Sequence, residues 1–151
     1  TPKELFNEPV NMFVASFIGS PAMNFLNGIF DGSKFIIKSE NKIIFALPLS
    51  KTHISLLKNY VNKQVVLGVR PEDIYINGDK SLNNPSEPFA LICDISELLG
   101  RELIVYSYIG NQRIIIKTNN KDDITSGDKE SYVLDMTRIH FFDPETTKTI
   151  R

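Results

Sequence analysis

The sequence predicts a mainly β protein, a small barrel or sandwich of about nine short strands preceded by a helical segment. Three observations predict this fold class. Short runs rich in β-branched and aromatic residues recur at fairly regular spacing from Phe25 onward. Turn signals such as Asp31-Gly32 and Gly110-Asn111 separate these runs. One helical pattern interrupts the strands, so the order is not the strand–helix alternation of a parallel α/β fold.

The chain begins with two helical patterns separated by a proline. Pro2–Glu8 forms the first pattern and Pro9 interrupts it. Val10–Ile18 forms the second, and Gly19-Ser20-Pro21 is a typical helix stop. The predicted exposed apolar face of this segment comprises Met12, Phe13 and Phe17. Apolar side chains at helical spacing have to pack on another surface.

The remaining elements follow in order. The strand predictions are Phe25–Phe30, Phe35–Ile37, Ile43–Phe45, Gln64–Val69, Ile74–Ile76, Phe89–Ser96, Glu102–Ile109, Gln112–Thr118, Ser131–Met136 and Ile139–Phe142. Lys51–Val61 has the spacing of an amphipathic helix, and Ser50 is suited to cap it. Asn77–Pro88 and Asn119–Glu130 have the composition of loops, and Leu98–Arg101 is predicted to be a turn.

Length and charge limit the classes of function. The chain has 151 residues and a formal net charge of −1, which allows one domain with an appendage. Segment 72–102 is acidic, with Lys80 and Arg101 as its basic residues. A nucleic-acid binder normally carries a basic field, so that class is disfavoured. The single Cys93 cannot form an internal disulfide, which favours a reducing compartment.

Residues with catalytic or metal-binding chemistry are sparse. No phosphate-binding glycine loop is present, and His53, His140 and Cys93 are too few for a structural zinc site. We interpret Cys93 as a buried thiol, because it lies in an apolar run. The acidic loop Asn119–Glu130 lacks the residue spacing of a calcium loop. We therefore predict no catalytic, cofactor-binding or metal-binding residue in this chain.

Two side-chain groups on predicted strands need interpretation. Tyr106 and Tyr108 would share one strand face, an arrangement that can stack bases in some β barrels. Given the charge balance, packing or protein contact is the preferred interpretation. Glu97 and Glu102 flank a turn and are interpreted as surface acids. The residues alone thus indicate a β-rich binding or interaction module.

Four runs together resemble a known family. The first reads TPKELFNEPVNMFVASFIGSPAMN, from Thr1 to Asn24. The others are Gly68–Asp73, Glu97–Gly100 and Phe142–Thr146. They resemble the C-terminal part of the ATP-binding subunits of carbohydrate ABC importers, of the maltose, multiple-sugar and glycerol-3-phosphate type.

The resemblance implies an OB-type (TOBE) regulatory domain over residues 22–151. Residues 1–21 would be the terminal helices and linker of an ATPase domain, which would hold the ATP and Mg²⁺. This chain would perform no chemistry itself. Its implied partners are its own ATPase domain, a second copy of itself, the membrane subunits of the importer and a regulatory protein. Its implied location is cytoplasmic, peripheral on the inner face of the plasma membrane.

Candidate contact residues lie in two of the matching runs. They are Arg70, Glu72, Glu97 and Arg101. Alternatively, Arg70 and Glu72 form an internal ion pair in a structural turn, and Glu97 and Arg101 are solvated turn residues. A second hypothesis for the whole chain is a small-ligand sensor for an oxyanion or a sugar. The lack of Trp offers little for such a pocket.

Overall fold

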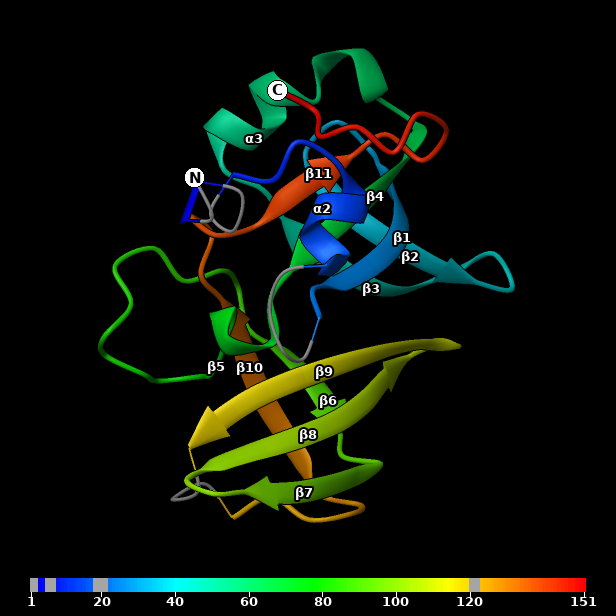
Figure 1. Cartoon of the computed structure of the whole chain (residues 1–151). Coiled ribbons are helices and arrows are strands. Elements are labelled where there is room, and N and C mark those ends of the chain that lie inside the picture. Colours follow the sequence, from blue (N-terminus) through cyan, green and yellow to red (C-terminus); the bar gives the residue numbers. More distant parts are fainter. Residues whose placement is uncertain (1–2, 5–7, 18–21, 120–122) are drawn as a thin grey trace.

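Three antiparallel sheets surround one hydrophobic core (Figure 1). The computed structural model describes residues 3–4, 8–17, 22–119 and 123–151. Within these residues eleven strands are present, and the three sheets do not close into a single barrel. The prediction of a mainly β chain with one internal helix is confirmed.

The first sheet has five strands in the order β11-β4-β1-β2-β3. Their bounds are β1 Asn24–Phe30, β2 Lys34–Ser39, β3 Lys42–Pro48, β4 Lys63–Val69 and β11 His140–Phe142. A tight turn joins β1 to β2, where the Asp31 carboxylate accepts the backbone N–H groups of Ser33 and Lys34 at 2.9 and 2.7 Å. Gly32 has a φ of +107° there, which a side chain would strain.

Two three-stranded sheets form the other half of the molecule. One has the order β5-β10-β6, the other β7-β8-β9. Their bounds are β5 Ile74–Ile76, β6 Phe89–Ile92, β7 Ile95–Leu99, β8 Glu102–Ile109, β9 Gln112–Asn119 and β10 Lys129–Leu134. In Figure 1, β7, β8 and β9 lie in front of β6 and β10, so one face of their sheet points to the viewer.

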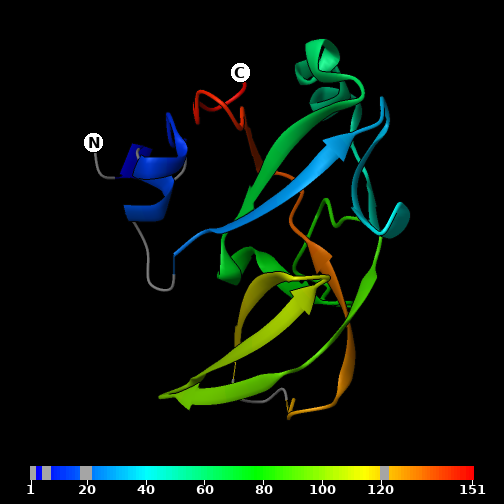
Figure 2. The ribbon, with the colours of Figure 1, turned by 90° about the vertical axis from the view of Figure 1, so that its right-hand side faces the viewer.

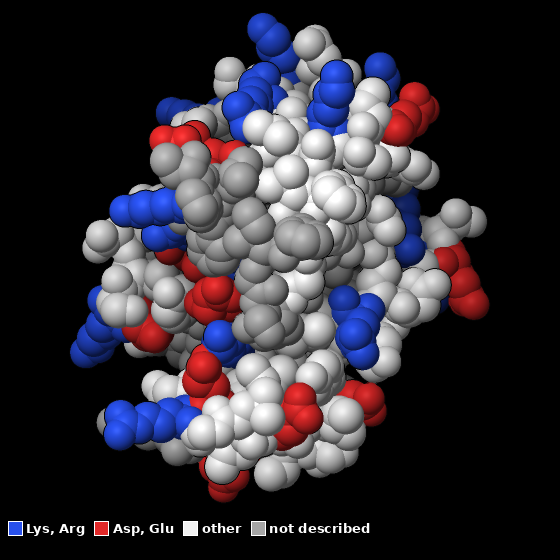
Figure 3. All heavy atoms as spheres, in the orientation of Figure 1, with Lys and Arg blue, Asp and Glu red and all other residues white. Residues whose placement is uncertain are grey.

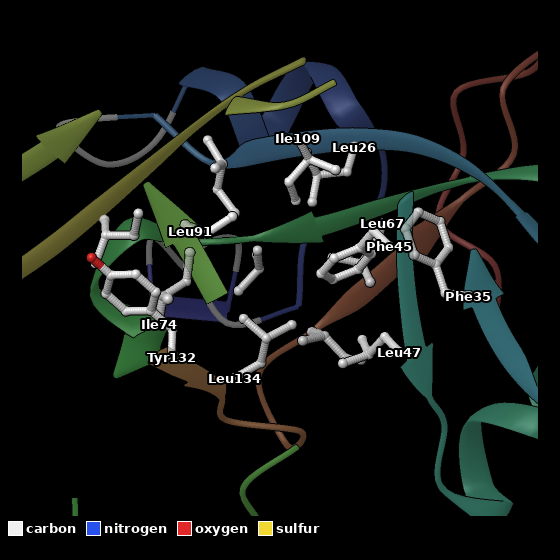
Figure 4. Packing of buried hydrophobic residues seen from close by; sticks show 14 of the residues in the cluster. Leu26, Phe35, Phe45, Leu47, Leu67, Ile74, Leu91, Ile109, Tyr132 and Leu134 are labelled. Atoms are coloured by element: carbon white, nitrogen blue, oxygen red, sulfur yellow. The ribbon is translucent and has the colours of Figure 1, made fainter. Parts of the chain in front are cut away.

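The core is shared by all three sheets (Figure 4). Leu26 and Leu67 come from the five-stranded sheet, Tyr132 from β10, and Val105 and Ile116 from the β7-β8-β9 sheet. Each of these side chains is buried. Burial of apolar area common to three sheets is the main force that holds them together.

The helices are shorter than the sequence patterns suggested. Helix α2 spans Met12–Phe17 and α3 spans Lys51–Leu56. The predicted helix Lys51–Val61 was therefore wrong in its extent, because its second half is a 3₁₀ turn, η1, at Lys58–Tyr60. Ser50 caps α3 as predicted, its hydroxyl accepting the His53 N–H at 3.3 Å. The predicted helix stop at residues 19–21 and most of the first helical pattern lie outside the described residues.

One predicted strand is in fact two. The pattern over Phe89–Ser96 breaks at Cys93 and Asp94, where the chain passes from the β10 neighbourhood to β8. Cys93 exchanges backbone hydrogen bonds with Gly127 and Asp128, whereas the Asp94 N–H donates to the Tyr106 carbonyl. The turn predicted over Leu98–Arg101 was also wrong in extent, because Leu98 and Leu99 belong to β7.

The C-terminal tail lies beside the segment that leads into α2 (Figure 2). The Met12 N–H donates to the Thr147 carbonyl at 2.9 Å, and the Thr149 N–H donates to the Val10 carbonyl at 3.0 Å. Thr149 also bridges to Phe142 on β11. The C-terminal tail thus links the N-terminal segment to the five-stranded sheet.

Candidate interaction surfaces

The run Arg70–Asp73 is a buried turn between two sheets. Pro71–Asp73 forms a 3₁₀ turn, η2, in which the Asp73 N–H donates to the Arg70 carbonyl at 2.9 Å. Arg70 is 2% exposed and Glu72 is half-buried. Since Arg70 has little surface to offer, the structure favours its interpretation as a residue of a structural turn. Its role as a partner contact stays a prediction.

Several ionisable groups lie close to this turn. Burial lowers the pKa of Arg70, and the negative charges of Glu72 and Asp73 oppose that effect. Burial and the charge of Glu72 raise the pKa of Asp73 to about 6. Burial, reinforced by the positive charge of Arg70, lowers the pKa of His140 to about 4. The protonation of Asp73 and of the neighbouring His140 therefore depends on the burial and charges around this turn.

Glu97 lies on β7 and Arg101 just beyond its end, and both are exposed. The Glu97 carboxylate accepts the Tyr106 hydroxyl at 2.7 Å, and the Arg113 guanidinium lies 5.5 Å from the centre of the Tyr106 ring. Arg101 lies in the turn between β7 and β8. Both residues therefore remain available to a partner.

The outward face of this sheet is aromatic and aliphatic. The pairing register places Ile95 opposite Tyr106, and Tyr106 opposite Ile115, on one face. Tyr108 shares that face, as its spacing predicted. Figure 3 shows mostly uncharged atoms over β7 and β8, interrupted by acidic side chains. Tyr and Arg are enriched in protein–protein interfaces.

Sequence reasoning missed the exposed aliphatic residues of β7. Ile95, Leu98 and Leu99 are 56%, 60% and 57% exposed, and β7 is the edge strand of its sheet. The apolar residues Ile95, Leu98 and Leu99 after Asp94 were the available signal. The predictions assigned Ile95 to a strand and Leu98 and Leu99 to a turn. The three side chains were therefore not recognised as belonging to one edge strand.

Helix α2 packs by one side and exposes the other. Ala15 is buried against Met23, Val66 and Phe142. Met12 is half-buried and packs on this small cluster, whereas Phe13 is 71% exposed. The side chain of Phe17 lies outside the described residues. Of the predicted exposed face, Phe13 alone among the described side chains is fully on the surface.

The other residues considered for chemistry have structural surroundings. Cys93 is buried, as predicted, and burial raises the pKa of its thiol. The His53 ring nitrogen Nδ1 lies 2.7 Å from the Ser50 hydroxyl oxygen, and burial lowers the pKa of His53. Among the described residues, no group of three or more His, Cys, Asp or Glu side chains is placed to hold a metal ion. No helix of the described part is long and apolar enough to cross a membrane.

A polar cavity lies between β5 and the end of β9. Its volume is about 530 Å³, and its lining includes Glu72, Tyr75, Asp79, Glu102 and Lys117. The Lys117 ammonium pairs with the Glu102 carboxylate at 3.0 Å. Three acidic side chains against one lysine make this cavity unsuited to an oxyanion.

Comparison with known proteins confirms the resemblance seen in the sequence. Residues 19–74 match the MalK OB fold domain. The Bacillus subtilis oligosaccharides import ATP-binding protein MsmX is 40% identical over 100% of this chain and 40% of its own length. The Streptococcus mutans multiple sugar-binding transport ATP-binding protein MsmK is 36% identical over 100% of this chain and 40% of its own length. The chain thus spans about two fifths of the length of the curated relatives it matches.

A solved structure supports the fold. The cytoplasmic molybdate-binding protein ModG superposes with a TM-score of 0.56, covering 80% of this chain and 96% of its own, at 13% identity. That level of identity supports the fold and nothing finer. The chain is therefore related, along its whole length, to ATP-binding proteins named for oligosaccharide import and multiple-sugar transport, and it has an OB-type fold.

Proposed function

We propose that this chain is the C-terminal regulatory and dimerisation part of the ATP-hydrolysing subunit of a sugar ABC importer. The observation that carries the proposal is its similarity, over its whole length, to two ATP-binding proteins named for oligosaccharide and multiple-sugar transport. The exposed aromatic and aliphatic face of the β7-β8-β9 sheet fits a role through protein contacts.

The proposed mechanism is mechanical and involves no chemistry in this chain. ATP and Mg²⁺ would bind in the part of the relatives that this chain does not span. Two copies of the domain would hold each other while the ATP-binding parts close and open. A regulatory protein that prefers one arrangement would shift the equilibrium by its difference in affinity for the two states. The importer's membrane subunits would hold the assembly at the inner face of the plasma membrane.

We propose a division between residues 1–21 and 22–151. The first part would be the final helices and linker of the ATPase domain. The hydrogen bonds between Met12 and Thr147 and between Thr149 and Val10 favour a firm joint between the two parts. A firm joint would transmit a movement of the ATPase domain to the five-stranded sheet.

The test removes residues 22–151 from the full-length ATP-binding protein. We expect ATP binding to persist, because the deleted part would contain no nucleotide ligand. We also expect dimerisation without nucleotide to weaken at least tenfold in sedimentation velocity. Unchanged dimerisation, together with unchanged regulation of sugar uptake in proteoliposomes, would contradict the proposal.

A neutral polyol ligand is a second candidate, favoured by the 530 Å³ cavity beside β5. Its lining combines Tyr75, Asn77 and Asn119 with carboxylates, a set of groups that suits sugar hydroxyls. Isothermal titration of this chain with neutral sugars and with molybdate would test it. A heat of binding with a sugar and none with molybdate would support this function. The absence of a binding heat with both would contradict it.

A further inference from the structure

We propose that strand β7 pairs antiparallel with β7 of a second copy of this chain. The pairing would join two β7-β8-β9 sheets into one continuous sheet of six strands. The inference rests on the proposed dimerisation and deepens it, since it assigns the contact to one strand edge. It follows from three features of β7, namely its open edge, its exposed aliphatic residues and its pattern of residues.

The edge of β7 has backbone groups free to pair. In the order β7-β8-β9, β7 has β8 as its single neighbouring strand among the described residues. Leu99 and Glu102 close the two-residue turn between β7 and β8, so the backbone groups of Ile95, Glu97 and Leu99 pair with β8. The N–H groups of Ser96 and Leu98 point away from it. They lie along an edge about 17 Å long, at roughly 3.4 Å per residue.

The side chains of β7 offer this edge little protection. Native proteins usually protect an edge strand with charged side chains, above all lysine, or with proline, a bulge or a covering segment. Of these devices β7 has one charged side chain, Glu97; it has no lysine and no proline, and its register with β8 has no shift from Ile95 to Leu99. Instead it exposes Ile95, Leu98 and Leu99 to more than half of their full area. Such an edge is a template for another strand.

The residue pattern of β7 suits a copy of itself. A two-fold axis at Glu97 places Ile95 of each copy opposite Leu99 of the other, twice, on the outer face. Isologous contacts repeat each favourable pair in this way. The two Glu97 side chains would face each other. Each carboxylate, however, accepts the Tyr106 hydroxyl of its own chain, and Arg113 lies against that Tyr106 ring. Each guanidinium places a positive charge on the same sheet, but the two opposed carboxylates still weaken the pairing.

The size of the contact predicts its strength. Five paired residues bury less than the roughly 800 Å² per partner of a standard interface. The isolated chains should therefore associate weakly. Two copies held together within one importer would pair readily, because their effective concentration would reach the millimolar range. The contact would then persist while the ATP-binding parts move.

Disulfide trapping tests the pairing directly. Glu97→Cys is made in a Cys93→Ala background, so that the introduced thiol is the sole one. In the proposed register Glu97 would form a non-hydrogen-bonded pair with its copy, whose two Cα atoms lie about 4.5 Å apart, within the range a disulfide spans. The matched control is Lys42→Cys on β3, the edge strand of the five-stranded sheet. We expect the Glu97→Cys chain to form disulfide dimers at least tenfold faster than the control under oxidised glutathione.

A second pair of variants tests the contact without cross-linking. Ile95→Lys places a charge on the edge, whereas Ile43→Lys does the same on β3 at a site of equal exposure, 56% against 58%. We expect Ile95→Lys to raise the dimer dissociation constant at least tenfold in sedimentation velocity and Ile43→Lys to leave it unchanged. Thermal unfolding checks that both variants fold.

The outcomes separate this inference from the proposed function. If dimers form but Glu97→Cys cross-links no faster than Lys42→Cys, the β7 pairing is wrong and dimerisation through another surface stands. If Glu97→Cys cross-links preferentially but Ile95→Lys leaves regulation of the full-length importer unchanged, the pairing is right and its proposed regulatory role is wrong. Equal cross-linking of both thiols in a chain that stays monomeric overturns the pairing.

Discussion

The charged residues around the Arg70–Asp73 turn link stability to pH. Asp73 on η2 and His140 on β11 both have pKa values far from those of the free side chains, in opposite directions. Asp73 binds a proton more readily in the folded chain, whereas His140 binds one less readily. Their contributions to stability therefore oppose each other over nearly the same range of pH.

Replacing His140 by Gln should reduce the stability that the folded chain loses as the pH falls from 7 to 5. In the unfolded chain the imidazole takes up a proton near pH 6.5, but in the folded chain it does so near pH 4. The unfolded state binds more protons between these values, so wild-type stability falls as pH falls through that window. The groups that repel the imidazolium are Arg70, His53, Arg138 and Arg151. Urea unfolding at pH 7 and pH 5 should show a smaller loss for His140→Gln; an equal loss would contradict the assignment.

Replacing Asp73 by Asn should have the opposite dependence on pH. The folded-state pKa of about 6 lies above the value of 3.8 for a free aspartate, so the folded state binds more protons between the two. The wild-type contribution is complete below about pH 3.8 and is lost as pH rises through 6. An uncharged Asn avoids that loss. The difference in melting temperature, Asp73→Asn minus wild type, should increase from pH 4.5 to pH 7.5. A constant difference would show that burial does not perturb this carboxyl.

At the scale of elements, close approach of backbones constrains the sequence most strongly. Gly28 on β1 faces β2, and a Cβ there would lie 2.5 Å from the Ile36 carbonyl oxygen and 2.5 Å from the Phe35 ring. Gly28→Ala should cost about 1–3 kcal/mol, the usual range for an overpacked interior. Gly78→Ala is the comparison, because its Cβ would meet nothing within 4 Å while its φ of +98° is strained. Denaturant unfolding should show the larger loss for Gly28→Ala.

The C-terminal tail should hold the N-terminal segment in place. Thr149→Pro removes the N–H that donates to the Val10 carbonyl. Thr149→Val keeps that N–H and loses only the hydroxyl bond to the Pro9 carbonyl. Hydrogen exchange at the Met12 amide should accelerate at least tenfold in Thr149→Pro and less in Thr149→Val, with Leu67 in β4 unchanged as the internal reference. Equal exchange in all three proteins would mean that packing of α2 alone holds the segment.

Local patterns predicted most elements but few of their boundaries. β8 and β9 were predictable because two strand-forming runs flank a Gly110-Asn111 turn. The whole signal for this hairpin lies within about 20 consecutive residues. The break at Cys93 was not predictable, since it depends on hydrogen bonds to Gly127 and Asp128, more than 30 positions away. Without that break, the open edge of β7 and its aliphatic residues could not be recognised as a surface.

At the scale of the whole molecule, two side-chain amides join the sheets. The Asn24 amide of β1 both donates to and accepts from the backbone of Ile115 on β9, at 2.8 Å each. The Gln112 amide of β9 does the same with the backbone of Asn27 on β1, at 2.9 and 2.7 Å. Asn27 and Gln112 are 85 positions apart, and Asn24 and Ile115 are 91 positions apart. No local sequence pattern could predict contacts at that separation. The amides satisfy backbone groups where the strands of the two sheets meet.

The buried member of this pair should matter more than the exposed one. Asn24 is 6% exposed, so Asn24→Ala would leave the Ile115 N–H and carbonyl without partners in a place that water reaches poorly. An unsatisfied buried polar group costs about 1–3 kcal/mol. Gln112→Ala removes the same two bonds from Asn27, which is exposed and can bond to water instead. Urea unfolding should therefore show a loss for Asn24→Ala of about 1–3 kcal/mol, and under about 1 kcal/mol for Gln112→Ala. If the two losses were equal, burial at the β1–β9 junction would not decide how strongly the sheets are joined.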